Sequence, residues 1–376
     1  MRLWLSISCG LALSAALLPL SGAFAQEGAV PSGKLRTEAV PLVLQKTVDD
    51  FIRPGYRNLV SATQDLTVTT KALCKAPSEE KLGAVQSSFN GVVKAWSAIE
   101  VVRVGPVIEG NRFERFLFYP DRKGTGLRQV QTLLAKPDET ATSAKTLNGK
   151  SVAMQGLGAL EFVLYGTGRE DVTAAPESFR CRYGAAIADN LASVASGLSA
   201  EWEKPDGIQQ AWKKPGPDNP VFRDDKEAIT GVLGILVHGT EAVKDQRLQA
   251  FYKGTVNGVP DKGRPKSAIY WRSGNTMASV ITNIEALKTL WETAGMQTLL
   301  DPGFGSLAGS VDFVFKSVLR VSRQIDLPVD RALAGKDEHA RLDFVLLNIN
   351  DLLNRLNKDY GGAIGLGAGF SFADGD

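Results

Sequence analysis

The chain has 376 residues, of which 44% are hydrophobic and 22% are charged, and its formal net charge is +2. This near-neutral balance, without any block of Lys or Arg, argues against a nucleic-acid or polyanion partner, which would need a basic face. The length suits two domains, or one large domain with two halves.

Residues 1–25 are predicted to be a signal peptide. They carry one charge, Arg2, followed by an apolar run, and they end in AFA at 23–25, the small-x-small pattern of a signal-peptidase site. A permanent transmembrane anchor is the alternative, but the run has no charged flank on its far side. We therefore predict export to the periplasm. The mature chain, 26–376, would carry a net charge of +1 and no transmembrane segment.

Apolar residues recur at steps of three and four along most of the mature chain, which is the spacing of amphipathic helices. Alternation of the kind that marks strands is scarce. The spacing therefore predicts an all-α protein. The clearest runs are Val85, Phe89, Val92, Trp96 and Ile99; Tyr183, Ile187, Leu191, Val194 and Leu198; and Leu342, Val345, Ile349, Leu352 and Leu356.

A connection rich in proline and glycine is predicted at residues 204–223. It holds four prolines and two glycines, which cannot continue a helix. Directly after it, Asp224 and Glu227 have the spacing of a helix-capping box. We therefore divide the mature chain into an N-terminal helical-bundle half at 26–203 and a C-terminal one at 224–376.

Two cysteines, Cys74 and Cys181, remain in the predicted mature chain. An even pair in an oxidising compartment favours one disulfide. The alternative is two buried thiols that do not pair.

One carboxylate lies in the middle of an apolar stretch, QGLGALEFVLYG at 155–166. Glu161 is the only acid or base between Lys150 and Arg169. A buried carboxylate needs a partner, a proton, a metal or access to water. Gly158 lies three residues before it, on the same helix face. Gly156 and Gly158 would leave room there for a ligand or another helix.

A second pair of polar side chains occurs in the C-terminal half. His238 and Glu241 are three residues apart in a helical pattern, so both could bind one metal ion. A hydrogen bond between the two on a partly solvated face is the simpler alternative. If a metal is bound, we expect Glu161, His238 and Glu241 to hold it.

Two arginines are candidate partners for Glu161. Arg103 follows Glu100 by three residues near the predicted end of a helix, and Arg272 follows Trp271 in a turn-like segment. Each could instead be a surface charge beside a core tryptophan.

Several catalytic signatures are missing from the sequence. It has no Gly-x-Ser-x-Gly elbow, no phosphate loop and no His-Glu-x-x-His, and it has only two histidines. A histidine-rich metal site or a Ser-His-Asp triad is therefore poorly supplied.

The sequence resembles the imelysin-like proteins, whose motif is Gly-x-His-x-x-Glu on a helix. The stretch QGLGALEFVLYG at 155–166 is similar to that motif, with Gly156 and Glu161 at its outer positions and Gly158 where the histidine stands. Further stretches add to the resemblance: AWSAIEVVRVGPV at 95–107, FYPDRKGTGLRQVQ at 118–131, KPGPDNPVFRD at 214–224, IYWRSGNTMASVITNIEAL at 269–287 and AGFSFADGD at 368–376.

The resemblance implies an exported bacterial protein of two helical-bundle halves related by a pseudo-two-fold axis, with the site in a cleft between them. It also implies either a metallopeptidase or an iron-regulated, iron-uptake-associated binding protein. A glycine supplies no ligand, so the missing motif histidine disfavours the peptidase, in which Glu161 would be the catalytic residue.

We therefore predict a non-enzymatic periplasmic protein, associated with iron acquisition, that binds a small ligand or a metal ion such as iron. A metal-dependent peptidase and a scaffold for periplasmic iron-uptake proteins are the alternatives. The predicted ligand site comprises Glu161, Gly156, Gly158, Glu100, Arg103 and Arg272.

Overall fold

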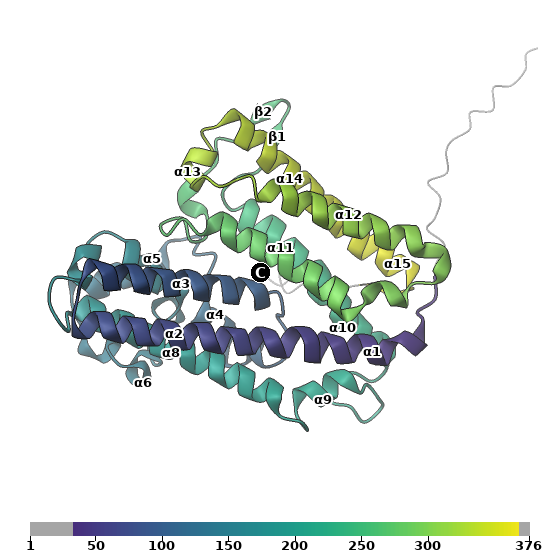
Figure 1. Ribbon diagram of the computed structural model, residues 1–376, viewed down its shortest axis with the longest axis horizontal. Helices are drawn as coiled ribbons and strands as arrows, with labels where there is room; N and C mark the ends of the chain where they lie inside the picture. Colours follow the sequence, from purple (N-terminus) through teal and green to yellow (C-terminus); the bar gives the residue numbers. More distant parts are fainter. Residues whose placement is uncertain (1–32, 368–376) are drawn as a thin grey trace, which may run out of the picture.

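The computed structural model describes residues 33–367, and the predicted signal peptide at 1–25 lies outside them. The described chain is built of helices (Figure 1). Its strands are β1 (Thr255–Val256) and β2 (Val259–Pro260), which form a short antiparallel ribbon. The all-α prediction is confirmed. No helix within 33–367 has the length and hydrophobicity required to cross a membrane.

The N-terminal half is organised around three long helices. Helix α1 (Val40–Lys46) passes through a π-helical segment at Thr47–Ile52 into α2 (Arg53–Lys75), and α2 packs on both α3 (Glu79–Ile99) and α8 (Phe179–Glu203). Shorter helices complete this half: α4 (Arg112–Phe116), α5 (Thr125–Ala135), α6 (Ala144–Leu147) and α7 (Leu157–Tyr165).

The C-terminal half contains α10 (Asp225–Ala242), which continues as a π-helical segment at Val243–Leu248, and α11 (Thr276–Ala294). Helices α12 (Gly305–Ser322) and α14 (Lys336–Asn354) pack on each other, with α13 (Val329–Ala332) between them in sequence. A third π-helical segment, Arg355–Tyr360, leads into α15 (Gly361–Ala363).

The connection between the halves is less irregular than its composition predicts. It holds a short helix, α9 (Ile208–Lys213), in the proline-free interval between Pro205 and Pro215. Trp212 stabilises it, because this buried ring contacts Trp202 at 6.0 Å and Phe222 at 5.0 Å between centroids. The capping box after the connection is present: Asp224 Oδ1 accepts a 2.9 Å hydrogen bond from the amide of Glu227.

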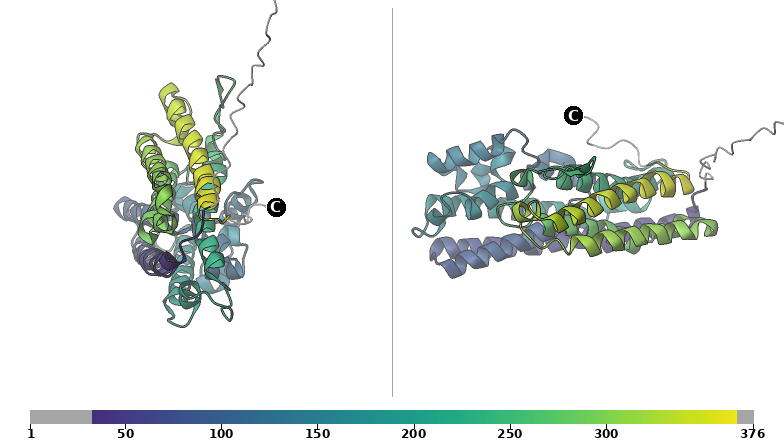
Figure 2. Two further views of the ribbon diagram at one scale, coloured as in Figure 1. Left: turned by 90° about the vertical axis from the view of Figure 1, so that its right-hand side faces the viewer. Right: turned by 90° about the horizontal axis from the view of Figure 1, so that it is seen from above.

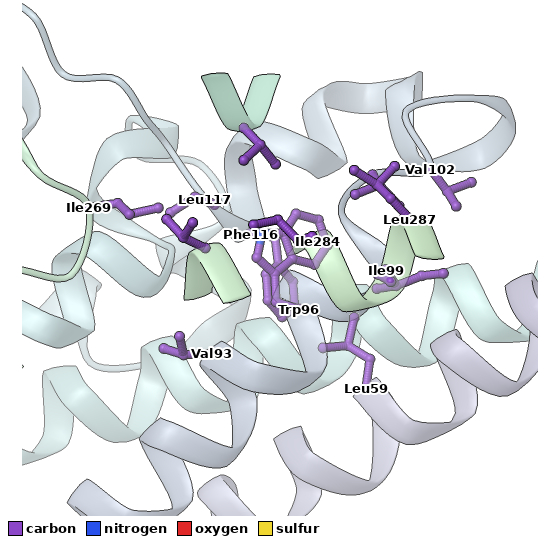
Figure 3. Close-up of a cluster of buried hydrophobic side chains, with 14 of the residues drawn as sticks. Leu59, Val93, Trp96, Ile99, Val102, Phe116, Leu117, Ile269, Ile284 and Leu287 are labelled. Carbon is purple, nitrogen blue, oxygen red and sulfur yellow. The ribbon is translucent and has the colours of Figure 1, made fainter. Parts of the chain in front are cut away.

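The two halves share one hydrophobic core. Helix α3 packs against α11, and α1 with the following π-helical segment also lies against α11. The long helices run roughly along the long axis of the molecule (Figure 2). Around the fully buried Trp96, which stacks on Phe116 at 4.2 Å between centroids, side chains from both halves meet (Figure 3). Those labelled from the C-terminal half are Ile269, Ile284 and Leu287. Burial of this apolar surface holds the halves together.

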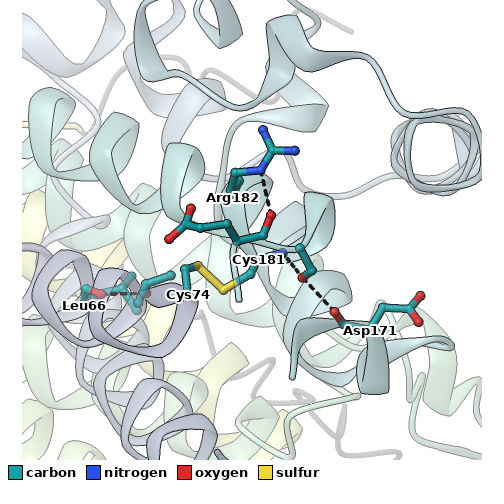
Figure 4. The surroundings of a disulfide bond; sticks show 8 residues. Leu66, Cys74, Asp171, Cys181 and Arg182 are labelled. Atoms are coloured by element: carbon teal, nitrogen blue, oxygen red, sulfur yellow. Dashed lines mark hydrogen bonds between the residues drawn. A yellow bond between two sulfur atoms is a disulfide. The ribbon is translucent and has the colours of Figure 1, made fainter. Parts of the chain in front are cut away.

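A disulfide joins Cys74, near the end of α2, to Cys181, in the first turn of α8 (Figure 4). The prediction of one disulfide is confirmed. The cysteines are 107 residues apart in sequence and their Cα atoms are 5.5 Å apart. Closing so long a loop lowers the entropy of the unfolded chain, which contributes roughly 4 kcal/mol in the chain-entropy account.

Candidate functional site

Glu161 lies on α7 and is buried, with 4% of its surface exposed. Its Oε1 accepts two hydrogen bonds from Ser273, one from the backbone amide at 2.9 Å and one from the hydroxyl at 2.8 Å. Hydrogen bonds to a carboxylate are stronger than those between neutral groups. The two bonds from Ser273 therefore offset part of the free energy lost when the Glu161 carboxylate leaves water. The partner of Glu161 is thus a serine that the sequence did not single out.

Arg272 lies beside Glu161 but stacks on aromatic rings. Its guanidinium is 4.4 Å from the centroid of Trp271 and 5.3 Å from that of Phe162. Burial raises the pKa of Glu161 above its ordinary value, while the bonds from Ser273 and the charge of Arg272 oppose that rise. Of the two arginines predicted as partners of Glu161, Arg272 is the one whose charge acts on the Glu161 carboxylate.

The turn before α11 fixes Ser273 in place. Tyr270 has a positive φ of 53°, an uncommon conformation for a bulky residue. Its carbonyl accepts a hydrogen bond from the amide of Asn275 at 3.1 Å and lies 3.2 Å from the hydroxyl oxygen of Ser273, whose single proton makes the shorter contact to Glu161. The strained turn thereby points both Ser273 donors at Glu161.

The two glycines predicted beside Glu161 differ in their surroundings. A Cβ on Gly156 would lie 2.5 Å from the carbonyl oxygen of Phe116, so this position permits no side chain. Gly158 is exposed, and a Cβ there would meet no atom of residues 33–367 within 4 Å. The position of the motif histidine therefore opens onto free space.

A separate cavity of about 1660 Å³ lies between the two halves. Its lining includes Glu100 and Arg103 from the N-terminal half and His238 and Glu241 from α10, all four singled out from the sequence. Glu161, Gly156, Gly158 and Arg272 are not among its lining residues. The predicted site residues thus fall into two groups, four in the cleft and four around α7 and the turn before α11.

The floor of the cleft is a buried ion pair that the sequence analysis missed. Arg247 Nη2 donates to Glu100 Oε2 at 2.8 Å, and both side chains are at most 3% exposed. Asn283 Nδ2 donates to Glu100 Oε1 at 2.9 Å. The guanidinium of Arg247 also lies 5.1 Å from the ring centroid of Tyr119. Burial opposes the charge of Arg247, yet Glu100 holds its pKa above the ordinary value.

Arg103 is a second cation in the cleft. It lies 4.3 Å from the ring centroid of Phe113, and its Nη2 donates to Gln246 Oε1 at 3.3 Å. Burial lowers its pKa to about 10, and the charge of Arg247 acts in the same direction.

His238 and Glu241 contact each other on the wall of the cleft, with Nδ1 of the imidazole 3.4 Å from Oε2 of the carboxylate. The two side chains therefore lie side by side on one helix face, as their spacing predicts. Within residues 33–367, no group of three or more His, Cys, Asp or Glu side chains is placed to hold a metal ion. That His238 and Glu241 share a metal with Glu161 stays a prediction, and the donor set of the described chain does not fit it.

The described chain is all-α, and helices from before and after the proline-rich connection pack against each other. The family model described as Imelysin matches residues 52–356, and the chain belongs to this family.

Two solved structures share the fold. An imelysin-like protein from Psychrobacter arcticum 273-4 superposes with a TM-score of 0.71 at 17% identity, over 90% of this chain and 99% of that one. A putative iron-regulated protein A precursor from Parabacteroides distasonis ATCC 8503 gives a TM-score of 0.70 at 13% identity, over 89% and 97%. No curated protein matches the sequence significantly.

Proposed function

We propose that this imelysin-family chain is an exported periplasmic protein that binds a ligand in the cleft between its halves and takes part, without catalysis, in iron acquisition. The observation that carries the proposal is the cleft itself. A cavity of about 1660 Å³ with a buried ion pair at its floor is larger than an ordinary small-molecule site of about 300–1,000 Å³.

The surroundings of Glu161 favour binding over metal-dependent catalysis. A metal ligand or general base needs an oxygen available to the metal or to the attacking water. Oε1 of Glu161 accepts both donors of Ser273, which leaves Oε2 alone for such a role, and Gly158 beside it supplies no ligand. We therefore assign Glu161 a structural role between α7 and the turn before α11.

Two observations support the biological setting. The fold is shared with a protein whose name describes it as iron-regulated and as a precursor. The Cys74–Cys181 disulfide suits an oxidising compartment, as does the signal-peptide pattern at residues 1–25.

The test of binding is calorimetric titration of residues 26–376, purified from periplasm, with ferrous, ferric, cupric and zinc ions and with ferric citrate. Glu241→Gln alters the cleft, and Glu161→Gln is its matched control outside the cleft. We expect binding that Glu241→Gln weakens and Glu161→Gln leaves unchanged, together with a ligand-dependent rise in melting temperature. Chelator-sensitive proteolysis that Glu161→Gln abolishes would contradict the proposal and favour a peptidase.

Export is tested by expressing the full chain and measuring the mass of the protein recovered from each cell fraction. We expect periplasmic protein that begins at Gln26, after removal of residues 1–25. Recovery of an uncleaved chain from the membrane fraction would contradict export as a cleaved protein.

A further inference from the structure

The floor of the cleft has hydrogen-bonding capacity that the described chain does not use. Arg247 is 2% exposed, and its Nη2 donates to Glu100, but its Nη1 has no hydrogen-bond partner within residues 33–367. Asn283, also 2% exposed, likewise leaves its Oδ1 without a partner there. Buried polar atoms are rarely left unsatisfied, because each one costs the free energy of its lost hydration.

The same floor holds two guanidinium groups, the buried one of Arg247 and the half-buried one of Arg103, beside a single buried carboxylate. Arg103 and Arg247 are close enough for the charge of one to lower the pKa of the other, and Glu100 is the buried carboxylate beside them. Glu114 also lines the cavity and favours the charge of Arg103, but it is exposed, where water screens it. An anionic group placed near the two guanidinium groups would therefore be stabilised.

The part of the cleft lining nearer to solvent combines charged side chains, such as Arg122, Lys123 and Asp224, with apolar ones. Among the large hydrophobic side chains of residues 33–367 that remain exposed, three line this cavity: Ile108 at 50%, Phe118 at 36% and Val221 at 38%. Ile108 and Phe118 come from the segments on either side of α4, and Val221 comes from the connection between the halves. Apolar side chains gathered around a cavity are typical of a surface that a ligand covers.

We propose that the cleft binds an amphiphilic organic anion, whose acidic group lies against Arg103 and Arg247 while its apolar body covers Ile108, Phe118 and Val221. This inference rests on the proposed function, because it names the chemical class of the ligand that the cleft takes. The cavity volume of about 1660 Å³ leaves room for a ligand with several ring systems.

The first test uses 1-anilinonaphthalene-8-sulfonate, an aromatic sulfonate that fluoresces when bound, titrated into the purified chain. We expect one saturable site per chain. Arg103→Gln is expected to weaken binding about tenfold, since it removes one charged hydrogen-bonding partner. Phe118→Ser should weaken binding severalfold. Arg320→Gln, an exposed position on α12 outside the cavity, is the control and should leave the affinity unchanged. Equal affinities for Arg103→Gln and Arg320→Gln would overturn the proposal.

The second test asks which part of a ligand matters. Biphenyl-4-carboxylate, its neutral analogue biphenyl-4-carboxamide, and citrate, which has charge but no apolar body, compete with the bound probe. We expect biphenyl-4-carboxylate to displace it at least tenfold more strongly than either of the others. Equal displacement by the amide would refute the anionic subsite, and stronger displacement by citrate would refute the apolar one.

The outcomes also separate this inference from the proposed function. If a metal ion or ferric citrate binds in a way that Glu241→Gln weakens, while the biphenyl compounds do not bind, the cleft takes a metal-containing ligand and only this inference fails. If neither these compounds nor the metal ions bind, both proposals fail. Melting curves of Arg103→Gln and Phe118→Ser verify that each variant is folded before it is titrated.

Discussion

Two buried glutamates, Glu161 on α7 and Glu100 directly after α3, are each 4% exposed but have different surroundings. Glu161 Oε1 accepts both donors of Ser273, away from the cavity. Glu100 pairs with Arg247 at the floor of a large cavity, where Nη1 of Arg247 has no partner in the described chain. Two glutamates that are equally buried therefore have different roles in this structure. The first carboxylate ties two segments together, and the second helps to build a place for a ligand.

The largest effect is expected from Glu100→Gln. It leaves the charge of Arg247 buried without a counter-charge, and such a loss destabilises proteins by about 3–5 kcal/mol. Chemical denaturation of this variant, compared with Glu114→Gln on the exposed wall of the same cavity, measures the effect. The control should change the free energy of unfolding by less than about 0.5 kcal/mol. Similar losses of unfolding free energy in Glu100→Gln and Glu114→Gln would show that the Glu100–Arg247 ion pair does not stabilise the fold more than an exposed carboxylate does.

Removing the Ser273 hydroxyl tests the other glutamate. Ser273→Ala deletes the 2.8 Å hydrogen bond to Glu161 but keeps the one from the backbone amide. A hydrogen bond to a charged group contributes about 1.5–3 kcal/mol, so we expect a loss of that size in equilibrium unfolding. Ser310→Ala is the matched control, because the Ser310 hydroxyl only bonds the Leu307 carbonyl in its own helix. A loss no greater than that of the control would argue against Ser273 as the partner of Glu161.

Gly156, at the motif's glycine position, and Gly158, at its histidine position, should respond differently to a side chain. Gly156→Ala forces a Cβ against the backbone of Phe116 and should cost about 1–3 kcal/mol. The Cβ of Gly158→His meets no atom of the described chain within 4 Å, so the variant should change the free energy of unfolding by less than about 1 kcal/mol. Thermal melting of both variants checks this, and a larger loss for Gly158→His would mean that this helix face is covered.

The smallest effect is a pH dependence. The folded-state pKa of Glu161 is raised by burial above its unfolded value of about 4.3. Its contribution to stability is therefore fully present below that unfolded pKa and is lost as the pH rises through the folded pKa. Melting temperatures of the wild type and of Glu161→Gln, measured from about pH 4 to about pH 8, test this prediction. The wild type should lose stability relative to the variant as the pH rises, whereas the opposite trend would mean a lowered pKa.

Much of the fold follows from the sequence, because helical spacing is local. The runs around Phe89, Leu191 and Ile349 lie in α3, α8 and α14, and the capping residue Asp224 begins α10. The Cys74–Cys181 pair follows from the number of cysteines in the predicted mature chain. Helix α9 was not predicted, because the four prolines around it dominate the composition of the connection.

The site was predicted less well, because its partners come from distant segments. Glu161 is conspicuous as a lone charge in an apolar stretch, but nothing local marks Ser273, which lies 112 residues later. Arg247 follows His238 by nine residues, which on a regular α-helix places it on the opposite side. The π-helical segment Val243–Leu248 changes that angle, and both side chains line the cleft.

The most direct test of the account is calorimetric titration of biphenyl-4-carboxylate into the wild type, Arg103→Gln and Glu161→Gln. The account places the ligand in the cleft and gives Glu161 a structural role. It therefore predicts that Glu161→Gln keeps the wild-type affinity within about twofold while Arg103→Gln loses about tenfold. Loss of binding in Glu161→Gln, with Arg103→Gln unchanged, would contradict it and move the ligand site to α7.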